Sequence, residues 1–169
     1  MTDRRAGARR RGARDSKMFA RATLLGALAI ASLVAAAATD TAVIVNSGST
    51  NMSGYKITIA SDGNGSMTPQ NRGGTPTGQP KTFTIPAASA SRFFGDLAAA
   101  RAAKLATEPC MKSASFGSTT HVTWQGWTSP DLDCPPQGPA SSALIKDVDE
   151  IRKASGAAAL PLKSVPLQQ

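Results

Sequence analysis

A long uncharged run near the N-terminus limits how much of this chain is free to fold. Residues 22–38 (ATLLGALAIASLVAAAA) follow a basic arm at residues 1–21 and end in the small-residue pattern Ala36-x-Ala38. A basic arm, an apolar run and small residues in this order are typical of an export signal peptide. We therefore expect residues 1–38 to be a signal peptide and the mature chain to begin at Thr39.

Two alternatives stay open for this leader. As a helix, the apolar run would span about 25 Å, whereas a hydrocarbon core is about 30 Å thick, so an uncleaved membrane anchor is the alternative to cleavage. Translation can start at Met1 or at Met18, because Met18 and Arg21 followed by the apolar run form a short signal peptide by themselves. We expect an exported protein, periplasmic or extracellular, or one held by a single N-terminal anchor.

The positive charge of the chain is concentrated in the leader. The sequence has 19 Lys and Arg against 11 Asp and Glu, a formal net charge of +8. The basic arm contributes +6 of this, and residues 39–169 contribute only +2. A nucleic-acid binder carries a basic surface on its folded part. We therefore expect no nucleic-acid partner, and a membrane contact only through an uncleaved leader.

Short strand patterns precede and follow a helical stretch in the rest of the chain. Tyr55, Ile57 and Ile59 alternate with polar residues, which is the period of a half-buried strand. Asp62-Gly63 and Asn64-Gly65 supply turn dipeptides for a returning hairpin. The strands expected from these patterns cover residues 42–46, 55–61, 66–68, 81–85, 119–125 and 127–129.

Two helices are expected between and after these strands. The first follows Pro86, is capped by Ser89 or Ser91, and runs to about Leu105. Its apolar stripe is expected at Phe94, Leu97, Ala98, Arg101 and Leu105, with Phe93 and Ala100 beside it. The second covers residues 142–155, where large apolar residues recur at helical spacing before Gly156.

This order of elements favours an α+β fold. We expect a small antiparallel sheet with two helices packed on one face, stabilised by one disulfide. Residues 39–156 are expected to form a single small domain. Residues 157–169, which contain Pro161 and Pro166, are expected to be an extended or disordered tail.

Several motifs carry a resemblance. Residues 54–59 (GYKITI) with Asp62-Gly63, residues 110–117 (CMKSASFG) and residues 129–135 (SPDLDCP) resemble a group of small exported bacterial proteins of unknown function. The resemblance extends over residues 42–154. It implies export and an α+β layout, and it implies no activity, cofactor or site residue.

Cys110 and Cys134 are the only cysteines in the chain. Export to an oxidising compartment makes a disulfide between them the expected state. The loop that they close stabilises the fold by roughly 3–4 kcal/mol in the chain-entropy model. No CxxC motif is present, and the chain has one histidine, so we expect no metal and no redox cofactor.

His121 is the residue on which a catalytic hypothesis depends. General-base chemistry requires it to meet a nucleophile and a carboxylate, and Asp131 and Asp133 follow it within twelve residues. The hydroxyl groups just upstream belong to Ser115, Ser118 and Thr119. On the expected strand, however, His121 lies on the polar side opposite Trp124, which favours a solvated histidine.

The sequence therefore predicts an exported domain with a structural or binding role, without a catalytic site, and with a protein or glycan as the partner. Trp124 and Trp127 are the candidates for stacking on a glycan. Because they are three residues apart, we expect them to face opposite sides or to lie across a bend, with one in the core. The alternatives are a hydrolase that uses His121 with Asp131 or Asp133, and a membrane-anchored envelope protein.

Overall fold

The computed structural model describes residues 39–113 and 115–160. The expected signal peptide at residues 1–38 and residues 161–169 of the expected tail lie outside the described residues.

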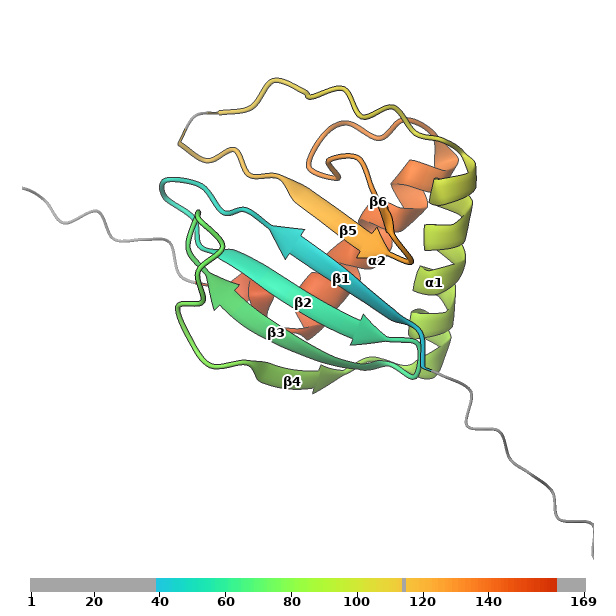
Figure 1. The fold of residues 1–169 in the computed structure, drawn as a ribbon, viewed down its shortest axis with the longest axis horizontal. Helices are drawn as coiled ribbons and strands as arrows, with labels where there is room; N and C mark the ends of the chain where they lie inside the picture. Colours follow the sequence, from blue (N-terminus) through green and yellow to red (C-terminus); the bar gives the residue numbers. More distant parts are fainter. Residues whose placement is uncertain (1–38, 114, 161–169) are drawn as a thin grey trace, which may run out of the picture. The chain divides into compact units, whose positions relative to one another are not determined.

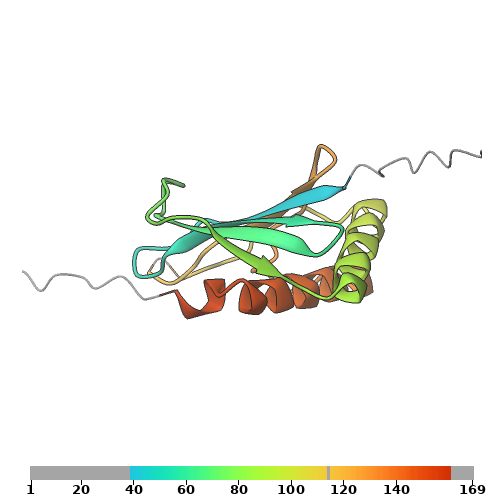
Figure 2. The same ribbon diagram turned by 90° about the horizontal axis from the view of Figure 1, so that it is seen from below.

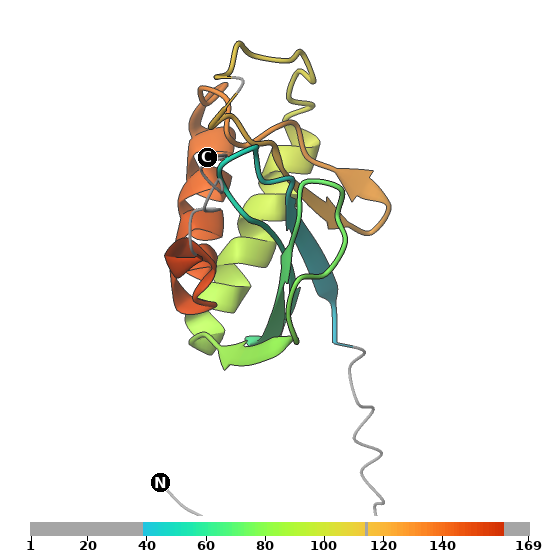
Figure 3. The ribbon, with the colours of Figure 1, turned by 90° about the vertical axis from the view of Figure 1, so that its left-hand side faces the viewer.

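Six strands of this part form one antiparallel sheet in the order β4-β3-β2-β1-β5-β6 (Figure 1). The strands are β1 (Thr41–Asn46), β2 (Gly54–Ala60), β3 (Asn64–Gln70), β4 (Lys81–Thr84), β5 (Thr120–Trp124) and β6 (Trp127–Thr128). The helices α1 (Ala87–Ala102) and α2 (Pro139–Ala154) lie on one face of the sheet, as Figures 2 and 3 show. The predicted α+β fold is confirmed.

Alternation along the strands decides which side chains reach the helices. Ile44 of β1 pairs with Ile57 of β2 and with Val122 of β5, and all three are fully buried. The opposite face of the sheet is mainly polar. One row across all six strands of that face consists of Thr82, Ser66, Thr58, Val43, Thr123 and Thr128.

β3 is longer than the strand expected at residues 66–68 and includes Pro69. Proline has no backbone N–H and is tolerated in a strand only where a ladder partner is missing. β4 pairs with residues 64–67 of β3 and does not reach Pro69; there the loop after β3 lies alongside, and the amide of Thr77 donates to the carbonyl of Pro69. The loop that joins β3 to β4 therefore begins after Gln70.

The buried stripe of α1 differs from the predicted one. The residues that face the sheet are Ala90, Phe93, Leu97 and Ala100, whereas Ala98 and Arg101 are exposed. The neighbouring Phe93 and Phe94 fit helical periodicity equally well, and Phe93 is the one in the core. Phe94 is half-buried, with its ring centroid 6.2 Å from that of Trp124 in an edge-on contact.

The start and end of α1 also need correction. Ser89 and Ser91 lie inside the helix and do not cap it, because Pro86 occupies the cap position and no side chain caps the first turn. The helix ends at Ala102, before Leu105, because Lys104 takes a left-handed conformation with φ of 48°. That conformation ends a helix and is usually taken by glycine.

α2 begins with Pro139, three residues earlier than expected, since proline is well suited to the first helical position. Gly156 follows the helix with φ of 79°, as predicted for a terminating glycine. Ala157–Ala159, which we assigned to the tail, form a 3-10 helix, η1, in which Ala157 is buried. The packed region therefore continues to Leu160.

A tight hairpin joins β5 to β6. Its two turn residues, Gln125 and Gly126, have φ of 47° and 74°, which is the left-handed pair of a type I′ turn. Trp124 and Trp127 pair directly across this turn and so lie on the same face of the sheet. Trp124 is buried and Trp127 packs against the core, so the two rings do not form an exposed stacking surface.

Candidate functional site

The predicted disulfide is present between Cys110 and Cys134, with a Cα–Cα distance of 5.7 Å. It joins the loop that follows α1 to the segment between β6 and α2. Between the end of β6 and Cys134, this segment continues alongside β5. The amides of Ser129 and Leu132 donate to the carbonyls of Val122 and Thr120. The regular pairing of β5 with β6 thus covers only Thr123–Trp124 and Trp127–Thr128, less than the strands expected at residues 119–125 and 127–129.

The described residues of the loop after α1, 103–113 and 115–119, form no helix or strand but are anchored at several points. Gln137 both donates to and accepts from the backbone of Ala106, at 2.8 and 2.7 Å. Lys112 donates to the carboxylate of Asp131 and to the carbonyl of Ser118. With the disulfide, these contacts fix the loop against the segment before α2. We call residues 103–113 and 115–119 the braced loop.

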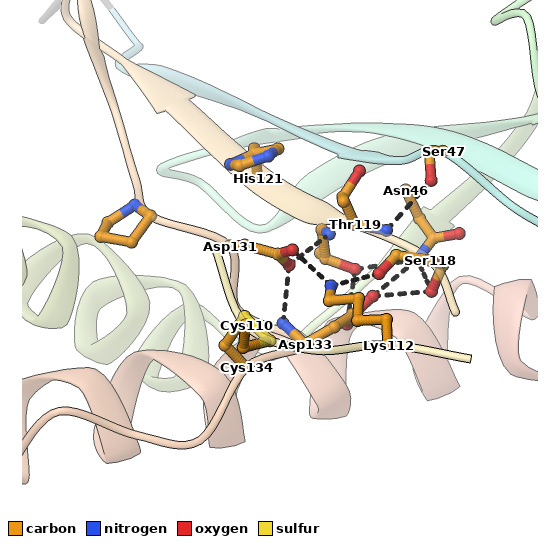
Figure 4. A network of polar contacts seen from close by, with 12 residues as sticks. Asn46, Ser47, Cys110, Lys112, Ser118, Thr119, His121, Asp131, Asp133 and Cys134 are labelled. Carbon is orange, nitrogen blue, oxygen red and sulfur yellow. Dashed lines mark hydrogen bonds and ion pairs between the residues drawn. A yellow bond between two sulfur atoms is a disulfide. The ribbon is translucent and has the colours of Figure 1, made fainter. Parts of the chain in front are cut away.

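Four polar residues form a cluster beside this loop (Figure 4). Asp133 accepts hydrogen bonds from the hydroxyls of Ser118, at 2.6 Å, and Thr120, at 2.8 Å. Nδ2 of Asn46 donates to Thr120 at 2.8 Å and lies 3.1 Å from the hydroxyl of Ser118. The cluster therefore connects β1, the braced loop, β5 and the segment before α2. Both carboxylate oxygens of Asp133 accept hydrogen bonds within it, so this side chain has a structural role.

Asp131 is held in a similar way. Besides Lys112, the amides of Thr120 and Asp133 donate to it at 3.1 and 3.0 Å. Burial opposes ionisation, but Lys112 and the two amides outweigh it and hold the pKa of Asp131 below its usual value. Asp131 is therefore an ionised carboxylate whose two oxygens both accept hydrogen bonds, and it stabilises the turn that leads to Cys134.

His121 lies on β5, where the sequence placed it, and its Nδ1 is 3.0 Å from the carbonyl oxygen of Ser129. Within the described residues, no hydrogen bond joins His121 to Ser118, Asp131 or Asp133. The serine contacts Asp133 directly instead. The structure thus brings the predicted Ser, His and Asp residues to one region without linking them in a catalytic order.

A groove of about 510 Å³ runs along His121. Its lining combines two prolines with polar side chains and comes from the braced loop, β5, β6 and the segment after β6. The lining residues are Thr107, Pro109, Thr119, His121, Thr128, Ser129, Pro130 and Asp131. A groove of this size falls within the range of about 300–1,000 Å³ that is usual for binding pockets.

Two large apolar side chains of the braced loop are exposed. Met111, next to Cys110, has a relative exposure of 102%, and Phe116 has one of 56%. The described residues contain one other exposed large hydrophobic side chain, Val45, at 36%. The two most exposed large hydrophobic side chains of the described residues therefore lie on the braced loop.

Two smaller cavities, of about 170 and 80 Å³, meet at Tyr55, Asp133 and Arg152. Burial raises the pKa of Tyr55 to about 12, against the attraction of Arg152, so the phenol stays neutral. Arg152 donates to Asp149 at 2.7 Å. Both cavities are below the usual size for a ligand pocket, so the groove is the better candidate site.

Sequence reasoning found His121, Asp131, Asp133 and the cysteines, but it missed Asn46, Lys112 and Arg152. Asn46 and Thr120 are 74 residues apart in the chain. Their contact depends on the pairing of β1 with β5, which no local pattern encodes. The exposed Met111 and Phe116 were not recognised either, although an apolar pair within a segment lacking strand or helix periodicity was a visible signal.

Comparison with known proteins finds no match: no family model, no curated protein and no solved structure is significantly similar to this chain. The resemblance to small exported bacterial proteins therefore stays a prediction. Among the described residues, no three His, Cys, Asp or Glu side chains are grouped so that they could hold a metal ion. None of the described helices is long and apolar enough to cross a membrane.

Proposed function

We propose that this protein is an exported binding domain that recognises a protein partner through the braced loop and the adjoining groove. The observation that carries the proposal is the exposure of Met111 and Phe116 on a loop that a disulfide and several hydrogen bonds anchor. Disulfides persist in oxidising compartments, and the Cys110–Cys134 bridge is compatible with export to the periplasm or the extracellular space.

Anchoring matters for the affinity of such a surface. A loop that is already fixed loses little conformational freedom when a partner binds, so more of the contact energy appears as affinity. Aromatic side chains are frequent anchors at protein interfaces, and the flexible thioether of methionine adapts to irregular apolar surfaces. The groove beside His121, which combines prolines with hydrogen-bonding side chains, extends this surface.

Site-specific photo-crosslinking tests this function. The full chain is produced in its own host with a photoreactive residue at position 111, at position 116, or at Thr84 on the exposed face of β4. We expect one discrete protein adduct from positions 111 and 116, reduced when Cys110 and Cys134 are both replaced by alanine, and none from position 84. Equal labelling from all three positions, or none from any, would contradict the proposal.

A hydrolase is the second candidate, because His121 and Asp131 line the same groove. The contact between Nδ1 and the carbonyl of Ser129 leaves Nε2 of His121 without a partner among the described residues. The test is turnover of ester, peptide and glycoside substrates by the purified full chain. Turnover that disappears in His121→Ala while the fold is retained would favour the hydrolase over the binding domain.

Attachment to the membrane depends on the leader. If residues 1–38 are removed, the exported protein begins at Thr39 and carries almost no net charge. If they are kept, the apolar run anchors the domain and the basic arm remains. Intact-mass measurement of the protein recovered from the host distinguishes a secreted domain from an anchored one.

A further inference from the structure

The two smaller cavities share three polar side chains that come from different parts of the fold. Tyr55 of β2, Asp133 of the segment before α2 and Arg152 of α2 line both the cavity of about 170 Å³ and the cavity of about 80 Å³. We call these three residues the Arg152 site. It brings together a carboxylate that accepts hydrogen bonds, a guanidinium that donates them and a phenol that does both.

The guanidinium of Arg152 has an unused donor. Its Nη2 donates to Asp149 at 2.7 Å, whereas its Nε is closed off from solvent and has no acceptor among the described residues. A buried N–H group normally has a hydrogen-bond partner. The side chain of Arg152 is 40% exposed, so the guanidinium has room to turn toward an acceptor in either adjoining cavity.

The carboxylate of Asp133 has acceptor capacity left as well. It accepts from the side chains of Ser118 at 2.6 Å, Thr120 at 2.8 Å and Asn46 at 3.4 Å (Figure 4). A carboxylate offers about four acceptor positions on its two oxygens. Because Asp133 is exposed and lines both cavities, a hydroxyl group of a ligand can donate to it.

The charges at the site favour a neutral ligand. Arg152 and Lys153 both pair with Asp149, at 2.7 and 2.5 Å, and Asp133 adds a second carboxylate. The two positive and two negative groups balance each other, so neither an anion nor a cation finds an excess of opposite charge. Since a hydroxyl group both donates and accepts, a neutral molecule with several hydroxyls matches the carboxylate, the guanidinium and the phenol together.

The size and the walls of the cavities restrict this molecule further. Both cavities are too small for a large ligand. A cavity of about 150 Å³ holds a benzene ring, so the larger cavity, of about 170 Å³, accommodates one six-membered ring. Its walls also include the apolar side chains of Leu132, Ile145 and Val148. A sugar ring has an apolar C–H face and a rim of hydroxyls, and it therefore matches apolar walls beside polar groups.

We propose that the Arg152 site binds one neutral sugar ring. The C–H face of the ring lies on the apolar wall of the larger cavity, and its hydroxyls donate to Asp133 and accept from Arg152. The smaller cavity takes a substituent of the ring. Met111 and Phe116 line neither cavity, so this site is separate from the surface proposed for a protein partner, and each proposal can fail without the other.

Methyl NMR of the full chain tests the site directly. The probes are glucose, galactose, mannose and N-acetylglucosamine, each as the free sugar and as its methyl glycoside. We expect at least one probe to shift the methyl signals of Ile145 and Val148 and to leave those of Ile85, which lines a separate cavity between α1 and α2, unchanged. Binding of the glycoside as well as the free sugar indicates the end of a glycan chain, binding of the free sugar alone indicates a monosaccharide, and both results support the site.

Arg152→Met removes the guanidinium and keeps the stem of the side chain. It should weaken binding by about tenfold or more, which corresponds to the loss of a hydrogen bond to a charged group. Tyr55→Phe removes only the phenolic hydroxyl and should also weaken binding, and it keeps the test valid if the first variant folds poorly. Lys153→Met is the matched control and should bind like the wild type, because Lys153 pairs with the same Asp149 but lines neither cavity.

Three results would overturn the proposal. The first is that no sugar shifts the methyl signals of Ile145 and Val148. The second is that acetate, butylamine or glycine binds at this site and none of the sugars does. The third is that Arg152→Met and Tyr55→Phe bind as tightly as the wild type, or no more weakly than Lys153→Met.

Discussion

Nε1 of the Trp124 indole lies 2.7 Å from Oδ2 of Asp40, and this bond ties the end of β5 to the residue that precedes β1. Gln125 in the hairpin turn donates to the same oxygen at 3.1 Å. Asp40 also bonds to Ser61 at the end of β2, through both backbone groups. The described fold therefore uses the second residue after the expected cleavage site to join three strands.

Replacing Asp40 by alanine should lower the free energy of unfolding by about 1–3 kcal/mol, because it leaves the indole N–H of the buried Trp124 without a partner. Denaturant unfolding of the full chain measures this loss. Trp124→Phe removes the same bond from the other side, so the double variant should lose less than the sum of the two single changes. Strict additivity would show that the bond contributes nothing.

The disulfide should be the largest single covalent contribution to stability. Replacing Cys110 and Cys134 together by alanine should lower the free energy of unfolding by roughly 3–4 kcal/mol, which corresponds to a fall in Tm of roughly ten degrees or more. Reduction of the wild type should give the same fall. A thiol assay on the unreduced, denatured protein should find no free cysteine, and two free thiols would refute the bridge in the exported protein.

Thr120→Val should destabilise the domain by about 1–3 kcal/mol, since it deprives Asp133 and Asn46 of a buried partner. The control is Thr123→Val on the same strand, where the side chain is on the exposed face. Because valine suits an exposed strand position as well as threonine does, this change should be nearly neutral. Similar losses from both variants would mean that the polar cluster adds no stability of its own.

The elements that could be predicted from the sequence are those that local patterns specify. Alternation of Tyr55, Ile57 and Ile59 marked β2 correctly, and the apolar spacing before Gly156 marked α2. The buried stripe of α1 was predicted around Phe94 and is observed around Phe93. Both residues fit helical periodicity, and only the position of the sheet determines which of the two is buried. Lys104 gave no signal at all, since a left-handed lysine is determined by the turn that the chain has to make after α1.

The candidate site was harder to predict because its contacts are long-range. The carboxylates at positions 131 and 133 were noticed, but their partners were not. Lys112 reaches Asp131 only because the disulfide holds the braced loop against the segment before α2. Asn46 reaches Thr120 only because β5 is inserted beside β1, although β1 and β5 are separated in the chain by three strands and a helix.

The lowered pKa of Asp131 predicts a loss of stability in acid. A carboxyl group of this kind contributes stability that is present above the unfolded-state pKa of about 3.9 and is lost as pH falls through the lower folded-state pKa. Asp131→Asn should therefore weaken the fold near neutral pH by roughly 1.5–3 kcal/mol and flatten the acid side of the stability profile. Unfolding measured from about pH 2 to about pH 7, around that pKa, checks both effects.

Lys112→Met is the companion change, since it removes the ammonium group and keeps much of the side chain's length. It should raise the pKa of Asp131 toward the ordinary value and move the acid transition to higher pH. A profile identical to the wild type would mean that the two backbone amides alone lower the pKa of this carboxylate.

Lys104→Gly should stabilise the protein, in contrast to most glycine substitutions. Lys104 has φ of 48° at the end of α1, a conformation that strains an L-residue by about 1 kcal/mol and that glycine adopts freely. Part of this gain is offset by the greater freedom of glycine in the unfolded chain, so we expect a net gain of a few tenths of a kcal/mol up to about 1 kcal/mol. Ala98→Gly, at an exposed position inside the same helix, is the matched control and should lose about 1 kcal/mol. Thermal unfolding of the two variants beside the wild type should thus give shifts of opposite sign, and a loss in both would show that the left-handed turn after α1 is not strained.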